Sequence, residues 1–189
     1  MSGINRYIQM IIVTALIILI TGCGTVQRHY DRNVDETGKP QWVVHGTQTS
    51  KTSQGRVFLG VGVVNTQGDF SREASTANNR AREEVAGTVT RFIEVAVRDY
   101  MASGNAEPAG FLPNEAPHYI DAMTQLVMPH AKVMEHWVDS EHHKIFAIAE
   151  IDYPQVQTVL YDSPKVHRGF KTYLNQHGEQ VFDRIATQH

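Results

Sequence analysis

The longest apolar run of the chain lies near its beginning, at residues 8–20. Arg6 precedes this run and is the only charged residue among the first 27 positions. A basic residue followed by an apolar segment too short to span a bilayer comfortably is typical of an export signal. Two small residues, Thr21 and Gly22, then lead to Cys23. The pattern predicts a signal peptide over residues 1–22.

Cys23 is the only cysteine in the chain, and its position favours lipidation. An apolar residue, two small residues and a cysteine form the lipobox of bacterial lipoproteins, in which the thiol receives a diacylglycerol and the chain is cleaved before it. Acylation of the new amine, for example by palmitate, gives stable anchoring at about 0.8 kcal/mol per buried methylene. The alternative is an uncleaved signal anchor with a chance cysteine. Gly24, not Asp, follows, and the lipoprotein sorting rule then predicts the outer membrane, on its periplasmic face.

Residues 56–65 predict the first buried strand, because they are apolar on both faces and bounded by turn residues. Gly60 and Gly62 share one face of this strand. A phosphate-binding glycine turn would lead directly into a helix, whereas Val63 and Val64 continue the strand. The two glycines are therefore interpreted as positions where a helix approaches the backbone closely.

A long amphipathic helix is predicted to end near Ala102, with Asp69 or Ser71 as its N-cap and Glu73 in its first turn. Its apolar stripe is small at the start and bulky later, so its start should pack on the two glycines. The stripe consists of Ala74, Ala77, Ala81, Val85, Thr88, Phe92, Val95 and Tyr100. The opposite, solvated face carries Arg72, Asn79, Arg82, Glu83, Thr90 and Glu94.

The remaining patterns predict a helix over residues 118–127, a hairpin of strands 132–139 and 144–152, and a short helix over 154–160. Together they indicate an α+β domain over residues 54–162. Its small antiparallel or mixed sheet packs against one long amphipathic helix, with additional short helices.

Two segments flank this domain. Residues 23–53 are polar and rich in turn formers, which predicts a lipidated tether. Trp42 is too apolar for a linker and is expected to dock on the domain. Residues 163–189 predict a C-terminal helical extension of one or two amphipathic helices broken near Gly178, packed on the domain or on a neighbour.

Charge gives no support for nucleic-acid binding. Without Arg6, 16 of the 17 Lys and Arg residues remain against 20 Asp and Glu, a net charge of −4. With one cysteine the fold has no internal disulfide and has to rest on apolar packing.

The residues offer no compact catalytic or metal motif. Zinc sites need three or four converging ligands, and the spacing of His130, His136, His142 and His143 matches no compact zinc motif. No Gly-x-Ser-x-Gly setting for a nucleophile is present. Adjacent carboxylates at 83–84 point different ways on a helix. We therefore predict no enzymatic activity, no cofactor and no metal.

Several stretches together resemble the LPP-twenty lipoprotein family, which includes a flagellar outer-membrane lipoprotein. They are the lipobox, the Pro-x-Trp of residues 40–42, the Gly-x-Gly strand at 59–62, the alanine-striped helix at 74–97 and the hairpin with Trp-Val-Asp at 137–139 and Phe-Ala-Ile-Ala at 146–149. The resemblance covers residues 40–160. It departs at residues 141–143, where Glu-His-His stands in place of an expected glycine. It implies an α+β domain and a non-enzymatic role at the outer membrane.

Three functional hypotheses follow. The first is a structural or assembly lipoprotein of the cell envelope, associated with the flagellum or another envelope machine and forming oligomers through an exposed sheet edge. The second is a periplasmic binding module that activates an envelope enzyme such as a cell-wall synthase, with a tether that spans about 100 Å when extended. The third is a hydrolase or metalloprotein built from the histidines.

Overall fold

The computed structural model describes residues 34–52, 55–104 and 114–186. The predicted signal peptide, Cys23 and the first part of the tether lie outside these residues. Within the described ranges no helix is both long and apolar enough to cross a membrane.

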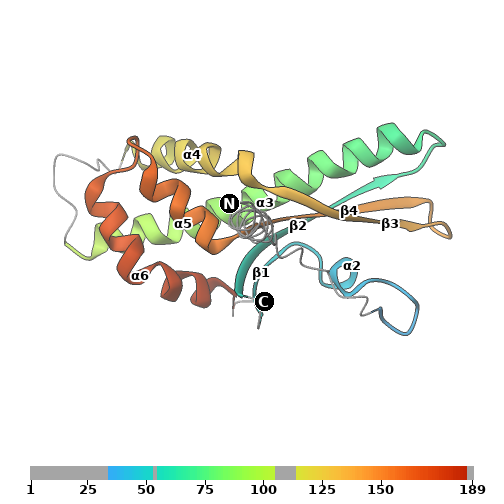
Figure 1. Ribbon diagram of the computed structural model, residues 1–189, viewed down its shortest axis with the longest axis horizontal. Coiled ribbons are helices and arrows are strands. Elements are labelled where there is room, and N and C mark those ends of the chain that lie inside the picture. The colour runs from blue at the N-terminus through green and yellow to red at the C-terminus, as the bar shows by residue number, and fades with distance from the viewer. Residues whose placement is uncertain (1–33, 53–54, 105–113, 187–189) are drawn as a thin grey trace, which may run out of the picture. The chain divides into compact units, whose positions relative to one another are not determined.

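The described residues form an α+β fold around a four-stranded antiparallel sheet (Figure 1). The strands lie in the order β1-β2-β4-β3, so the two long strands β2 and β4 occupy the centre. This confirms the predicted fold class. The strands are β1 (Gln48–Thr52), β2 (Gly55–Asn65), β3 (Lys132–Asp139) and β4 (Lys144–Asp152). The helices are α2 (Gln41–His45), α3 (Phe70–Ala102), α4 (Ala116–Val127), the 3-10 turn η1 (Met128–His130), α5 (Tyr153–Asp162) and α6 (Arg168–Ala186).

The two glycines of β2 allow α3 to approach the sheet closely, as predicted. A Cβ atom added at Gly60 would lie 2.2 Å from the carbonyl oxygen of Ala81, and one at Gly62 would lie 2.2 Å from that of Ala77. Both alanines are fully buried. Bare backbone on the strand and small side chains on the helix together bring α3 against β2.

The start of α3 has the capping arrangement that the sequence predicts. The carboxylate of Asp69 accepts a hydrogen bond from the backbone N–H of Arg72 at 3.1 Å. The carboxylate of Glu73 turns back and accepts from the backbone N–H of Asp69 at 3.3 Å. These reciprocal bonds satisfy N–H groups that the first turn of a helix leaves without partners.

The buried face of α3 is broader than the predicted stripe. Five stripe residues are buried and three, Ala74, Thr88 and Val95, are half-buried. Four further apolar side chains of α3 that the stripe omitted are also buried: Val89, Ile93, Ala96 and Val97. The placement of Thr90 on the solvated face is wrong, because its hydroxyl lies 3.0 Å from that of Thr124 on α4. The second half of α3 packs against helices as well as against the sheet.

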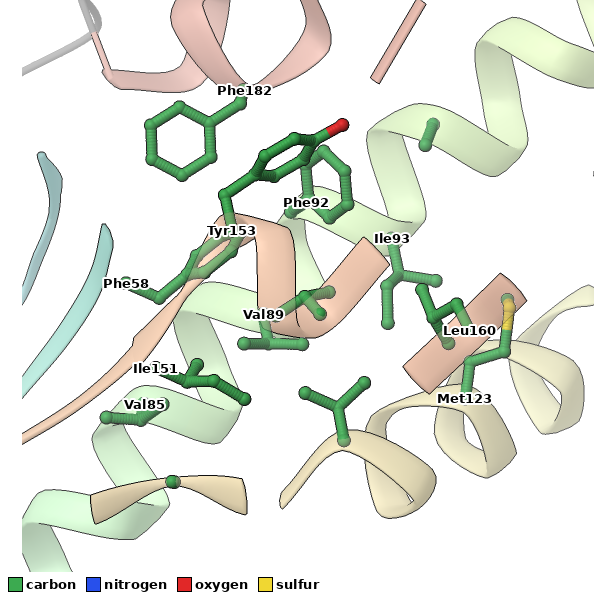
Figure 2. Close-up of a cluster of buried hydrophobic side chains, with 14 of the residues drawn as sticks. Phe58, Val85, Val89, Phe92, Ile93, Met123, Ile151, Tyr153, Leu160 and Phe182 are labelled. Carbon is green, nitrogen blue, oxygen red and sulfur yellow. The ribbon is translucent and has the colours of Figure 1, made fainter. Parts of the chain in front are cut away.

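Four aromatic rings from four different elements meet in the core (Figure 2). Phe58 of β2 lies 5.0 Å, centroid to centroid, from Phe182 of α6 and 5.5 Å from Phe92 of α3. Tyr153 of α5 contacts Phe182 and Phe92 at 5.5 and 5.6 Å. Edge-to-face pairs of this kind stabilise a core beyond the area they bury. The cluster joins the sheet to the C-terminal helix.

The sequence left open whether the C-terminal segment packs on the domain, and α6 does so. Its buried residues belong to the same core as the sheet. The domain therefore continues past the predicted boundary at residues 162–163. The predicted break near Gly178 is wrong, because α6 is continuous from Arg168 to Ala186. Gly178 instead makes room for a neighbour, since a Cβ atom there would lie 2.2 Å from the hydroxyl of Tyr153.

The predicted tether is wrong in its second half. Residues 48–52 form β1, which pairs along β2 from Gln48 opposite Leu59 to Thr52 opposite Gly55. An edge strand pairs on one side only and can carry polar side chains. Such a polar segment cannot be distinguished from a linker by its apolar pattern. Trp42 on α2 is 5% exposed, which confirms that it docks. Figure 1 shows α2 on the opposite side of the sheet from α3.

Candidate functional site

The predicted lipidation site, Cys23, lies outside the described residues. Lipidation and the outer-membrane location therefore stay predictions from the sequence. The described residues offer three further features with functional meaning: the histidines, the outer edge of the sheet, and a hollow beside α6.

The histidines named in the sequence do not converge. His130 ends η1, whereas His136 lies on β3, so the two histidines do not share a strand face. His136 hydrogen-bonds the side chain of Asn78 on α3, and His142 bonds Asp139 at 2.9 Å. Within the ranges that the structure describes, no three His, Cys, Asp or Glu side chains lie close enough to hold a metal ion.

The turn between β3 and β4 has the conformation that favours glycine. His143 has a φ angle of 51°, in the left-handed region. This is one of the three positions where the family resemblance leads one to expect glycine. The turn is held by Asp139, whose pKa lies below its usual value chiefly because the backbone N–H of His142 donates to it at 3.0 Å. The charge of Lys39 adds a smaller effect.

The two edges of the sheet differ. Edge strand β1 and its neighbour β2 are tied to α6 by a cluster of charges. Arg56 on β2 contacts Asp183 at 2.7 Å and Glu179 at 3.0 Å, and Lys51 on β1 contacts Asp183 at 2.6 Å. Hydrogen bonds from Arg56, and more weakly from Lys51, lower the pKa of Asp183 to about 2. The cluster locks this end of the sheet to the C-terminal helix.

The other edge strand, β3, has no strand on its outer side among the described residues. A β-bulge interrupts its pairing with β4 between Val133 and Glu135. Beyond the bulge, Trp137 is half-buried with its ring 5.5 Å from that of Phe146, and Val138 is 42% exposed. The edge therefore combines backbone groups open to pairing with apolar side chains that are only partly covered.

A hollow of about 980 Å³ lies where the end of α3 meets the start of α6. Its wall is formed by Tyr100 and Ser103 from α3, the turn before α6, and the first turns of α6. The residues that line it are Tyr100, Ser103, Pro164, Lys165, Val166, His167, Arg168, Gly169, Thr172, Tyr173, Gln176 and His177. None of these is an Asp or a Glu, although the chain carries a net charge of −3.

This hollow was not predicted from the sequence, in which residues 163–189 show only a sparse apolar stripe. The signal that was present is the run of residues 163–171, which carries Lys165, Arg168 and Lys171 and no acidic residue. No local pattern indicates that Tyr100, 65 positions before Lys165, forms the opposite wall.

Comparison with models of known protein families gave no match, and comparison with curated proteins found no similar protein. The resemblance to the LPP-twenty family stays a prediction. Statements about function rest on the arrangement of these residues and on the export pattern of the sequence.

Proposed function

We propose that this protein is a lipid-anchored assembly component of the bacterial cell envelope, held through Cys23 at the periplasmic face of the outer membrane. In this proposal the folded domain pairs through the outer edge of β3 with a second copy or with another envelope protein. A flagellar complex is one such assembly. The location rests on the sequence of residues 6–24. The observation that carries the assembly role is the open β3 edge.

An edge strand presents unpaired backbone N–H and C=O groups to any strand that aligns with it. β3 has eight residues, Lys132–Asp139, about the length of the strands that pair inside sheets. Pairing would also cover the exposed face of Val138. The bulge, together with the charged side chains of Lys132 and Glu135, disfavours indiscriminate pairing along this edge.

Two copies can satisfy one another if their β3 strands lie antiparallel about a two-fold axis. The axis then passes near the middle of the strand, close to Glu135 and His136. Residues that face each other across such an axis have Cα atoms about 4.5–5.5 Å apart, which is within the range that a disulfide bridges.

The experiment introduces a single cysteine at Glu135 in the lipoprotein and oxidises native membranes. Cys23 is acylated in the proposal and contributes no free thiol. The matched control is Glu94→Cys on the outer face of α3, since both glutamates are exposed. We expect disulfide-linked dimers from Glu135→Cys and none from Glu94→Cys. Equal dimer from both variants, or none from either, would refute pairing of two copies through β3.

Two further measurements test the remaining parts of the proposal. Mass spectrometry of the native protein should find Cys23 acylated at a new N-terminus, and an unmodified thiol with an intact leader would refute the location. A deletion strain that swims normally would exclude a role in the flagellum. The general assembly role would then be tested by the cross-linking experiment alone.

The structure weakens the alternative of a long-reaching activator of an envelope enzyme. Residues 34–52 belong to the folded domain, so only residues 23–33 of the predicted tether remain available as a linker. These eleven steps along the chain span at most about 40 Å when extended, compared with the roughly 100 Å expected for the full tether. The domain therefore stays close to the membrane surface in our proposal.

A further inference from the structure

The hollow between α3 and α6 has the charge pattern of an anion site. Lys165 and Arg168 line it, and neither has a carboxylate partner among the described residues. Some cations elsewhere in the domain do have such partners, for example Arg56 with Asp183 and Arg184 with Asp99. Positive side chains gathered around a concavity without carboxylates favour a negatively charged ligand.

The walls of the hollow add aromatic surface to this charge. The rings of Tyr100 and Tyr173 lie 5.6 Å apart, and the ring of Tyr173 lies 4.9 Å from that of His177. Tyr100 is almost fully buried and forms a fixed part of the wall. Aromatic side chains offer an apolar face together with a polar tip, which suits a ligand whose polar body carries C–H groups.

The size of the hollow indicates more than a bare ion. A volume of about 980 Å³ lies at the upper end of small-molecule sites, which measure about 300–1,000 Å³. A phosphate group alone would leave most of this space unused. The hollow instead fits a charged group attached to a glycerol or sugar.

We propose that this hollow binds a phosphate ester carried on a polyol, with Lys165 and Arg168 contacting the phosphate. Arg168 supplies the planar fork that matches phosphate oxygens, and Lys165 supplies a mobile point charge. The polyol lies against Tyr100 and Tyr173. Such an ester has two sources, the headgroup of an anionic phospholipid or a soluble sugar phosphate. The lipid source rests on the proposed function, because it needs the domain close to a membrane.

The test uses the full chain solubilised in a neutral detergent and calorimetric titration at low salt. One probe is dihexanoyl phosphatidylglycerol below its critical micelle concentration, and the other is glucose 1-phosphate. The variant Lys165→Glu/Arg168→Glu reverses both cations of the hollow. The control Arg80→Glu/Arg82→Glu makes the same change in net charge at two exposed residues outside the hollow.

We expect at least one probe to bind, the hollow variant to lose at least tenfold in affinity, and the control to stay within about twofold of the wild type. Binding of the lipid probe alone identifies a headgroup as the source, and equal binding of glucose 1-phosphate identifies a soluble ester. No binding of either probe, or the same loss in the hollow variant and the control, overturns the proposal. Circular dichroism of both variants checks that the fold is intact.

These outcomes are independent of the proposed assembly role. The titration measures ligand binding to the hollow in detergent, whereas the Glu135→Cys cross-link measures pairing of the β3 edge in membranes. Absence of ligand binding together with an intact cross-link would refute only the ligand proposal. Ligand binding without the cross-link would refute only pairing through β3.

Discussion

Replacing Gly60 by alanine should be among the most damaging single-methyl additions to this domain. The new Cβ atom would lie 2.2 Å from the carbonyl oxygen of Ala81 and 2.4 Å from the backbone nitrogen of Val85. Both atoms belong to the backbone of α3, so no side-chain rotation relieves the contact. The helix has to move away from the sheet.

The size of the effect follows from that movement. Non-bonded carbon atoms are most stable about 3.5–4.0 Å apart, and a gap of about 0.5–1 Å forfeits a quarter to a half of the dispersion energy. A shift of roughly 1 Å would loosen α3 along β2, where Ala77, Ala81 and Val85 are fully buried. Overpacking costs about 1–3 kcal/mol in ordinary cores. Because the obstacle here is backbone, we expect a loss of about 3 kcal/mol or more in the free energy of unfolding.

The matched control lies within the same helix. Gly87 is exposed in the interior of α3, and a Cβ atom there would meet nothing within 4 Å. Alanine should therefore stabilise the helix by about 0.5–1 kcal/mol, because glycine loses more backbone entropy on folding. Gly62→Ala should resemble Gly60→Ala, and the double variant should lose less than the sum, since both changes move the same helix.

Equilibrium denaturation by guanidinium chloride, followed by circular dichroism in neutral detergent, measures these differences. The reasoning is refuted if Gly60→Ala stays within about 0.5 kcal/mol of the wild type, or if Gly87→Ala destabilises the protein as much as Gly60→Ala does.

Three further predictions concern buried or paired side chains. Gly178→Ala should cost about 1–3 kcal/mol, and Tyr153→Phe should restore much of it by removing the hydroxyl that meets the new methyl, as a double-mutant cycle can show. Burial raises the pKa of Tyr153 to about 12, above its unfolded value of about 10. The free energy of unfolding of the wild type should therefore fall by about 2–3 kcal/mol as the pH rises from 10 to 12, and that of Tyr153→Phe should not show this fall. Asp183→Asn should cost about 1 kcal/mol at pH 7 after allowance for solvent screening. Because the pKa of Asp183 is lowered to about 2, that difference should disappear as the pH falls from 4 to 2 in parallel denaturation curves.

The parts of the fold that could be predicted are those with strong local periodicity. The strand at 56–65, the hairpin and the long helix each carry an apolar pattern that fixes their type. The tight contact at Gly60 and Gly62 followed from alternation along a strand and from small residues at the start of the helix. These features need no knowledge of distant parts of the chain.

The parts that could not be predicted depend on distant neighbours. β1 is polar because it lies at an edge, and its pairing with β2 leaves no apolar trace in residues 48–52. In the sequence, Gly178 suggests a helix break. The structure shows that glycine is needed there because the hydroxyl of Tyr153 occupies the space of a side chain. The hollow brings Tyr100 together with Lys165 and Arg168, which only the tertiary structure reveals.

The position of α6 has a consequence for how the protein is made. Phe170 and Phe182 complete a core whose other members were synthesised up to about 120 residues earlier, beginning with Phe58. A nascent chain that ends before Arg168 therefore has no means of closing its core. If the chain is exported as proposed, it has to pass a secretion channel unfolded, and before α6 is made the core still lacks Phe170 and Phe182. In that case, late completion of the core would help to keep the preceding residues competent for export until α6 has been synthesised.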